Sequence, residues 1–268
     1  MANQRAGEIA VESIIGIGAS GYVIRINDQN VLKLPRIHKD PKASAEQAQI
    51  YEIFARQNRA AIEHEKNVRR RLGNHPGFVE WTDQPGDGIL MKNMKGGSLD
   101  NYLRSTTPSP SVAQKWILDI ADAICYAHLQ HVIIGDIASK NVLLDENWKA
   151  KLCDLGYSGL ISPSTNIAFA VDDGASIQTD IFQFGTVMFE ILSQKRYHYN
   201  LFDNEEVARR VACCHGEYEP RAEWPPVDEL PATGHLRFGA VVRKCWTRVY
   251  LDMTEVCDDL SREATALG

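Results

Sequence analysis

The stretch from Ile134 to Gly156 constrains this chain more than any other. Val142 to Leu144 is apolar and prefers the strand conformation, Asp145-Glu146-Asn147 consists of turn-forming residues, and Lys149 to Cys153 fits a second short strand. These features predict a tight hairpin. The two ends of the stretch are therefore expected to lie close together.

Polar residues stand at both ends of this hairpin. Asp136 and Asn141 precede it, and Asp154 follows it. Two carboxylates and an amide at one mouth would suit a hard cation such as Mg²⁺, which prefers oxygen ligands and accompanies phosphate groups. Taken alone, the stretch is equally compatible with a surface hairpin whose carboxylates are solvated.

Length and charge narrow the function classes. The 268 residues suffice for one large domain or for two lobes that share a cleft. The formal net charge of -6 argues against a general nucleic-acid binder, which would need a basic face. No apolar run is long enough to span a bilayer, so we expect no membrane partner.

The cellular location is predicted from the N-terminus and the cysteines. Met-Ala-Asn-Gln-Arg is not followed by the apolar core of a signal peptide. The six cysteines lack a Cys-x-x-Cys pair and zinc-like spacing. Reduced cysteines are typical of an intracellular protein, so we expect this protein to reside in the cytoplasm or the nucleus.

The N-terminal part reads as strands around a glycine cluster. Strands are predicted at Ile9 to Ile15, Tyr22 to Ile26 and Val31 to Leu34, with Gly16 to Gly21 in the first turn. Glycine has no Cβ, so such a turn can lie close over a phosphate. An ordinary hairpin turn is the alternative interpretation.

A helix is predicted from Ala43 to Leu72, with a break near Gln57-Asn58. Short strands are expected at Phe78 to Trp81 and Ile89 to Met91. The flexible connection Lys95 to Ser98 is the predicted boundary between a small strand-rich lobe and a helical lobe.

The remaining chain is predicted to be mainly helical. The expected segments are a helix from Val112 to Ala127, a loop from Leu160 to Ser176, a helix capped by Thr179 that runs through Ile191, and helices at Asn204 to Cys213, Thr233 to Val249 and Thr254 to Ala264. Strands followed by helices are the α+β pattern.

Together these features resemble the eukaryotic protein-kinase domain over nearly the whole chain. The matching motifs are the glycine-rich loop Gly16-Ile17-Gly18-Ala19-Ser20-Gly21-Tyr22-Val23, the third-strand Lys33, the αC glutamate Glu65, the catalytic-loop spacing of Asp136 and Asn141, the metal motif Cys153-Asp154-Leu155-Gly156, the αF signature Thr179 to Gly185, and the pair Cys245-Trp246. Several motifs in the right order are far more specific than any one of them.

The resemblance implies a single bilobal domain over residues 1–268. Its N-lobe, about residues 1–94, would be a small antiparallel sheet with one main helix. Its C-lobe, about residues 95–268, would be larger and helical.

The resemblance also implies a role for each motif residue in binding ATP and Mg²⁺. The expected catalytic residues are Asp136, Lys33, Glu65 and Lys140. Asn141 and Asp154 would hold the metal. The expected nucleotide-binding residues are Gly16, Gly18, Gly21, Val23, Val31, Lys33, Met91, Met94 and Leu143. Asp180 is expected to hold the backbone of the catalytic loop rather than to react.

The sequence departs from the family pattern at three places. Ile134-Gly135 replaces the usual His-Arg, so we expect no switch gated by a phosphorylated activation loop. No Ala-Pro-Glu motif is recognisable between Ala168 and Gln178, and its arginine partner near Leu251 to Thr254 is also missing. Arg69 stands where the αC helix usually offers an apolar residue.

The expected activity is ATP-dependent phosphorylation of a protein hydroxyl, with serine or threonine favoured over tyrosine as the acceptor. Lys140 resembles the tyrosine-kinase loop pattern, which leaves the acceptor open. The alternatives are a pseudokinase that acts as a nucleotide or protein binding module, and a kinase of small-molecule hydroxyls, because Gly135-Asp136 resembles the loop of antibiotic and choline kinases.

Overall fold

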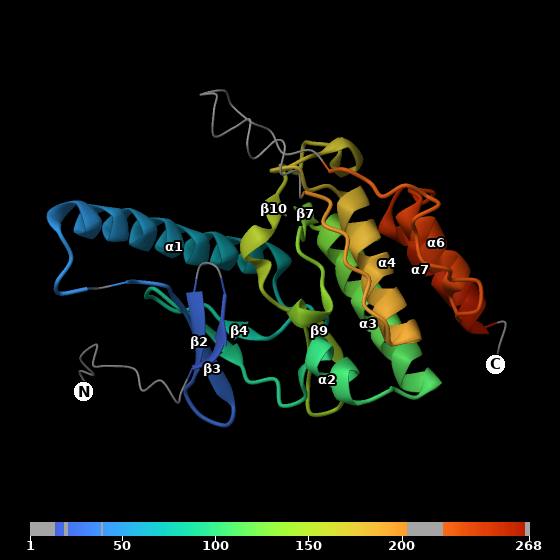
Figure 1. Ribbon diagram of the computed structural model, residues 1–268, viewed down its shortest axis with the longest axis horizontal. Helices are drawn as coiled ribbons and strands as arrows, with labels where there is room; N and C mark the ends of the chain where they lie inside the picture. Colours follow the sequence, from blue (N-terminus) through green and yellow to red (C-terminus); the bar gives the residue numbers. More distant parts are fainter. Residues whose placement is uncertain (1–13, 19–20, 39, 203–221, 266–268) are drawn as a thin grey trace. The chain divides into compact units, whose positions relative to one another are not determined.

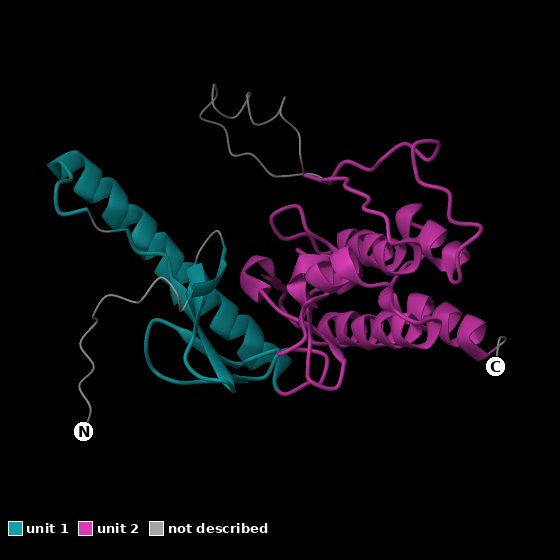
Figure 2. Ribbon diagram, turned by 60° about the horizontal axis from the view of Figure 1, so that its bottom comes forward, with its two compact units in different colours: residues 1–73, 79–94 teal, residues 74–78, 95–268 magenta. Residues whose placement is uncertain are grey.

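The computed structural model describes residues 14–18, 21–38, 40–202 and 222–265 (Figure 1). The chain divides into two compact units (Figure 2). The first unit contains residues 1–73 and 79–94, and the second contains residues 74–78 and 95–268.

The first unit contains an antiparallel sheet. In the order β1-β2-β3-β5-β4, its strands are β1 (Ile14–Ile17), β2 (Gly21–Arg25), β3 (Asn30–Pro35), β5 (Ile89–Lys92) and β4 (Trp81–Thr82). Burial alternates along β3, with Val31, Lys33 and Pro35 on its buried side. This alternation places the predicted catalytic lysine inside the unit. Residues 9–13 of the first predicted strand lie outside the described residues.

The one long helix of this unit is α1 (Ala45–Leu72). Ser44 caps its first turn through a capping box with Gln47. The predicted break near Gln57-Asn58 is wrong, because the helix is continuous. Asn58 does not interrupt it, since its side-chain amide donates to the carbonyl of Arg36 instead (2.7 Å).

The second unit is mainly helical in its described part. Its helices are α2 (Leu99–Ser105), α3 (Pro110–Leu129), α4 (Ile177–Ser193), α6 (Gly239–Trp246) and α7 (Met253–Thr265). Its short strands are β6 (Gly97–Ser98), β7 (Val132–Ile133), β8 (Val142–Leu144), β9 (Ala150–Leu152) and β10 (Gly159–Leu160), and its 3-10 turns are η2 (Ser139–Asn141), η3 (Leu155–Tyr157) and η4 (Ile167–Phe169).

The helices of this unit pack around α3 and α4 (Figure 1). α3 contacts α4 and α7, and α4 contacts α6. A Cβ on Gly185 would lie 2.7 Å from the Cβ of Cys245, so glycine permits the close approach of α4 and α6. The indole of Trp246 donates to Thr186 Oγ1 (3.1 Å). The Cys-Trp pair therefore fixes α6 against α4.

A sheet with one long helix, followed by a helical unit, confirms the predicted α+β class. No helix in the described ranges has the length and apolar character needed to cross a membrane.

Two predicted helix starts are wrong. α4 is capped by Ser176, and Thr179 is its N3 partner in a capping box. The helix predicted from Thr233 begins only at Gly239, because Phe238 has a left-handed backbone (φ 57°) that interrupts helical geometry. The helix predicted at residues 204–213 lies outside the described residues.

The fully buried carboxylate of Asp180 connects α4 to the loop after β7. Its oxygens accept hydrogen bonds from His128 Nε2 (2.9 Å) and from the backbone N–H groups of Ile134 and Gly135 (both 2.8 Å). A buried carboxylate is tolerated only with such partners. The expectation that Asp180 holds this loop is confirmed.

Replacing Asp180 should therefore destabilise the protein. We expect Asp180→Ala to lower the free energy of unfolding by about 3–5 kcal/mol, because it leaves buried donors without an acceptor. Urea denaturation, followed by circular dichroism, measures this change. The control Asp258→Ala removes an exposed carboxylate on α7 and should change stability by less than about 0.5 kcal/mol. A loss below about 1 kcal/mol for Asp180→Ala would contradict this account.

Candidate active site

The loop between β7 and η2 carries Asp136. Besides the bonds to Asp180, α4 holds this loop through Gln183, whose Oε1 accepts from the Ile137 N–H (2.9 Å) and whose Nε2 donates to the Gly135 carbonyl (3.0 Å). Sequence reasoning missed Gln183, although it lies one turn after Asp180 on the same helix. The loop is thus fixed on both sides of Asp136.

The carboxylate of Asp136 is oriented by two neighbours. Its Oδ2 accepts from Asn141 Nδ2 (2.9 Å) and forms an ion pair with Lys140 Nζ (3.2 Å). The Asp136 side chain is still 31% exposed. It is therefore held in place, yet accessible to a reacting group from solvent.

The predicted hairpin is confirmed by the pairing of β8 with β9, in which Val142 faces Leu152. Beyond this pair, the Cys153 N–H donates to the Asn141 carbonyl (2.9 Å). Asp154 follows directly, with a left-handed backbone (φ 55°) that turns the chain into η3. Asp154 and Asn141 therefore come from the same end of the hairpin.

These residues have the chemistry of a magnesium site completed by phosphate. Asn141 Nδ2 is committed to Asp136, which leaves Oδ1 as the amide atom to ligate a cation. Asp154 supplies a carboxylate. Mg²⁺ needs only one or two such protein ligands when phosphate oxygens and water complete its shell. Among the described residues, no three His, Cys, Asp or Glu side chains are grouped to hold a metal on their own.

In the first unit, β3 and α1 bring Lys33 and Glu65 together. Lys33 Nζ lies 2.6 Å from Glu65 Oε2, and both side chains are almost fully buried. The sequence predicted this pair from two motif positions. The structure places them in contact across 32 residues of chain.

The Glu65 carboxylate has a second cationic partner, Arg69. The Arg69 guanidinium donates to Glu65 Oε1 through Nη2 (2.8 Å) and Nε (3.1 Å), and Nη1 donates to the Val79 carbonyl (3.2 Å). Burial would raise the pKa of Glu65, but the charges and hydrogen bonds of Arg69 and Lys33 outweigh it and hold this pKa at about 2. The sequence signal for this contact is the four-residue spacing on a helix.

The glycine-rich turn joins β1 and β2. Gly16 lies opposite Val23 in the sheet, and the Gly18 N–H donates to the Gly21 carbonyl (2.8 Å). Residues 19–20 at the tip lie outside the described residues. The described part is thus a closed antiparallel turn, as its motif predicts.

The apolar residues that are expected to bind the nucleotide are found in both units. In the first unit Val31 and Met91 are paired in the sheet and buried, Met94 is buried and Val23 is half-buried. Leu143 is half-buried on β8 in the second unit.

Gly135 stands where the family usually has the arginine that binds a phosphorylated activation loop. Its backbone is left-handed (φ 82°), and a Cβ here would lie 2.6 Å from the Tyr157 carbonyl oxygen. The next turn is fixed as well, because Ser158 Oγ donates to the Ile134 carbonyl (3.0 Å). Any side chain at position 135 would therefore strain the backbone.

A neutral contact joins α4 to the turn at Tyr250–Leu251, where the family's ion pair is missing. Gln178 Nε2 donates to the carbonyls of Tyr250 (2.9 Å) and Leu251 (3.1 Å). Sequence reasoning did not identify Gln178. The two parts of the chain are thus connected without a buried charge.

This chain is similar in sequence to several protein kinases. A probable serine/threonine-protein kinase of Dictyostelium discoideum is 24% identical over 89% of this chain and 26% of its own length. The dual specificity protein kinase zakA of the same organism is 27% identical over 60% of this chain and 23% of its length. The human cytoplasmic tyrosine-protein kinase BMX is 27% identical over 49% of this chain and 22% of its length.

The aligned region covers about a quarter or less of these relatives. The model of the family described as "Protein tyrosine and serine/threonine kinase" matches residues 15–246. This match spans most of the chain, including the glycine-rich turn, the Lys33–Glu65 pair and the Asp136 loop. The chain therefore belongs to the protein tyrosine and serine/threonine kinase family.

Proposed function

We propose that this domain transfers the γ-phosphoryl group of ATP to a hydroxyl group of a protein, with serine or threonine as the expected acceptor. The observation that carries the proposal is the environment of the Asp136 carboxylate. Its carboxylate is oriented by Asn141 and Lys140, stays accessible, and stands on a loop fixed by the core of its unit.

Asp136 would act on the acceptor hydroxyl. An accessible carboxylate can accept a hydrogen bond from the hydroxyl and orient its oxygen for attack on the γ-phosphorus. Lys140, paired with Asp136 at 3.2 Å and largely exposed, would contribute positive charge to the transferred group.

The other residues would serve ATP. Lys33, held by Glu65, would bind the phosphates, and the backbone of the glycine-rich turn would cover them. Asp154 and Asn141 would hold Mg²⁺, which neutralises charge on the phosphates when bound. Little covalent chemistry is needed from the protein, because positioning and electrostatics supply most of the acceleration.

The names of the relatives leave the acceptor open, since they include serine/threonine, dual specificity and tyrosine kinases. A pseudokinase is disfavoured by the joint presence of Lys33, Glu65, Asp136, Asn141 and Asp154. A small-molecule kinase is disfavoured by the extent of the protein-kinase match.

A transfer assay tests the proposal. With radiolabelled ATP and Mg²⁺, we expect wild-type protein to label members of a peptide library. The rate of labelling by Asp154→Asn should be lower by at least about 100-fold, because a metal-binding charge is gone. Asp258→Asn on exposed α7 is the matched control and should label as wild type does.

Simple alcohols in the same assay distinguish the alternatives. Labelling of alcohols without peptides would indicate a small-molecule kinase, and no transfer at all would indicate a binding module. Full labelling by a correctly folded Asp154→Asn protein would show that the metal assignment is wrong.

Nucleotide binding should raise the melting temperature. ATP with Mg²⁺ at 100 times its Kd stabilises a native protein by about 2.7 kcal/mol, which thermal melting detects as a rise of several degrees. Lys33→Met should remove most of this rise, whereas Lys115→Met, a change at an exposed position of α3, should keep it. No rise for wild type at millimolar nucleotide would contradict ATP binding.

The Glu65 pair predicts a specific pH dependence of stability. The pKa of Glu65 is about 2 in the folded protein and near 4.5 when unfolded, so its ion pairs stabilise the fold above pH 4.5 and lose this effect as the pH falls toward 2. The linked free energy is roughly 3 kcal/mol.

Glu65→Gln should remove this component. We expect the unfolding free energy of wild type to fall more steeply than that of the variant between pH 5 and pH 3 in denaturation titrations. Parallel pH profiles for the two proteins would contradict the assignment of Glu65 as a charged partner of Lys33 and Arg69.

A further inference from the structure

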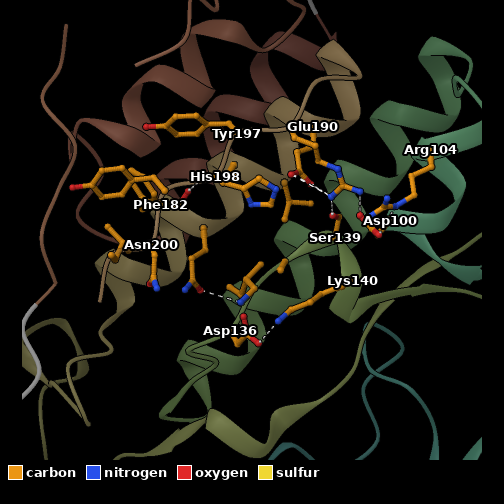
Figure 3. Close-up of a pocket in the computed structure, with 18 residues that line it drawn as sticks. Asp100, Arg104, Asp136, Ser139, Lys140, Phe182, Glu190, Tyr197, His198 and Asn200 are labelled. Atoms are coloured by element: carbon orange, nitrogen blue, oxygen red, sulfur yellow. Dashed lines mark hydrogen bonds and ion pairs between the residues drawn. The ribbon is translucent and has the colours of Figure 1, made fainter. Parts of the chain in front are cut away.

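A cavity of about 520 Å³ lies beside Asp136 within the second unit (Figure 3). Its walls come from α2, the loop from Asp136 to Lys140, one face of α4 from Phe182 to Glu190, and residues 196–201. Because Asp136 forms part of the wall, a chain segment bound here would lie next to the reacting hydroxyl.

The charges that line this cavity are balanced. Three carboxylates (Asp100, Asp136 and Glu190) face three permanent cations (Arg104, Lys140 and Arg196). Lys140 pairs with Asp136 at the loop. Arg104 pairs with Asp100 along α2 (Nε to Oδ2, 3.0 Å). Asp100 on α2 and Glu190 on α4 mark one end of the cavity, because Arg196 contacts both of them.

Arg196 occupies this acidic end. Its guanidinium forms an ion pair with Asp100, lies 3.4 Å from Glu190 Oε2, and donates to Ser139 Oγ (3.0 Å). The guanidinium fork thus contacts three segments that a bound cationic side chain would otherwise meet.

Burial of the Asp100 and Glu190 carboxylates would be unfavourable without positive charge beside them. The side chains of Asp100 and Glu190 are only 14% and 7% exposed. Burial raises the pKa of the Glu190 carboxyl, against the lowering effects of the Ser139 hydroxyl and of His198. Without Arg196, Asp100 would keep only Arg104 and Glu190 would lose its guanidinium partner, so this end of the cavity would attract a cation.

The rest of the wall is less charged. Tyr197 and Tyr199 are half-buried and line the cavity. The buried Phe182 of α4 lies behind them and contacts Tyr199 edge to face, with ring centroids 6.1 Å apart. Such a surface suits an apolar or aromatic side chain.

We propose that Arg196 is a specificity-determining residue that occupies, from within the chain, a subsite for a guanidinium group beside the acceptor hydroxyl. The protein then selects peptides whose residues near the acceptor are uncharged, with an apolar side chain placed against Tyr197 and Tyr199. This inference rests on the proposed phosphorylation of peptides, but the subsite itself can be tested without catalysis.

The first experiment compares peptides that differ only in whether leucine or arginine flanks the acceptor. We expect wild type to use the leucine peptides at least as well as the arginine peptides. Arg196→Ala should raise the ratio of kcat/KM for arginine over leucine by about tenfold or more, because Glu190 loses its guanidinium partner and Asp100 keeps only Arg104. Arg196→Lys keeps the charge but not the guanidinium fork, so its ratio should lie between those of wild type and Arg196→Ala.

An unchanged ratio in Arg196→Ala would overturn the proposal. A wild-type preference for arginine of about tenfold would overturn it as well, since the subsite would then be open. If Arg196→Ala does not melt cooperatively, Arg196→Met replaces it, because methionine keeps an apolar stem without the guanidinium.

The second experiment measures binding of N-acetyl-arginine amide by NMR titration. Arg196→Ala should bind this probe saturably in the millimolar range, wild type should not, and adding Asp100→Asn to the variant should weaken binding by about tenfold. If neither wild type nor the variants phosphorylate any peptide, the proposed function is wrong, but this titration still tests the subsite. Absence of probe binding by folded Arg196→Ala would overturn the proposed guanidinium subsite.

Discussion

The geometry of the catalytic loop depends on one buried carboxylate. Asp180 accepts hydrogen bonds from His128 and from two consecutive backbone N–H groups, so the loop before Asp136 cannot move without breaking bonds inside the core. α4, which carries Asp180, is buried along most of its length and is held closely against α6 at Gly185. The accessible carboxylate of Asp136 is thus positioned by the packing of helices remote from it.

The first unit also contains a buried carboxylate that is held by several partners. Glu65 on α1 forms ion pairs with Lys33 on β3 and with Arg69 one turn further along α1. A buried carboxylate needs such partners to remain charged. Because Arg69 also donates to the Val79 carbonyl, it connects Glu65 to the chain that follows α1.

Features encoded by neighbouring residues and recognised motifs could be predicted from the sequence, whereas most contacts between residues far apart in the chain could not. The β8–β9 hairpin followed from strand and turn residues that are adjacent in sequence, and the Lys33–Glu65 contact followed from recognised motif positions. The break in α1 was wrong because Asn58 binds a carbonyl 22 residues away, which no local pattern contains. Gln178 and Arg196 were missed for the same reason, since their partners lie far along the chain. The roles of the site residues stay predictions.

The backbone at Gly135 has a consequence for how this sequence can change. Position 135 combines a left-handed φ with a Tyr157 carbonyl oxygen that would lie 2.6 Å from any Cβ. A residue with a Cβ would be strained here, so the loop that presents Asp136 tolerates substitution at this position poorly. The loop before Asp136 and the turn after Asp154 therefore restrict each other's sequence, although they are separated along the chain by the whole β8–β9 hairpin.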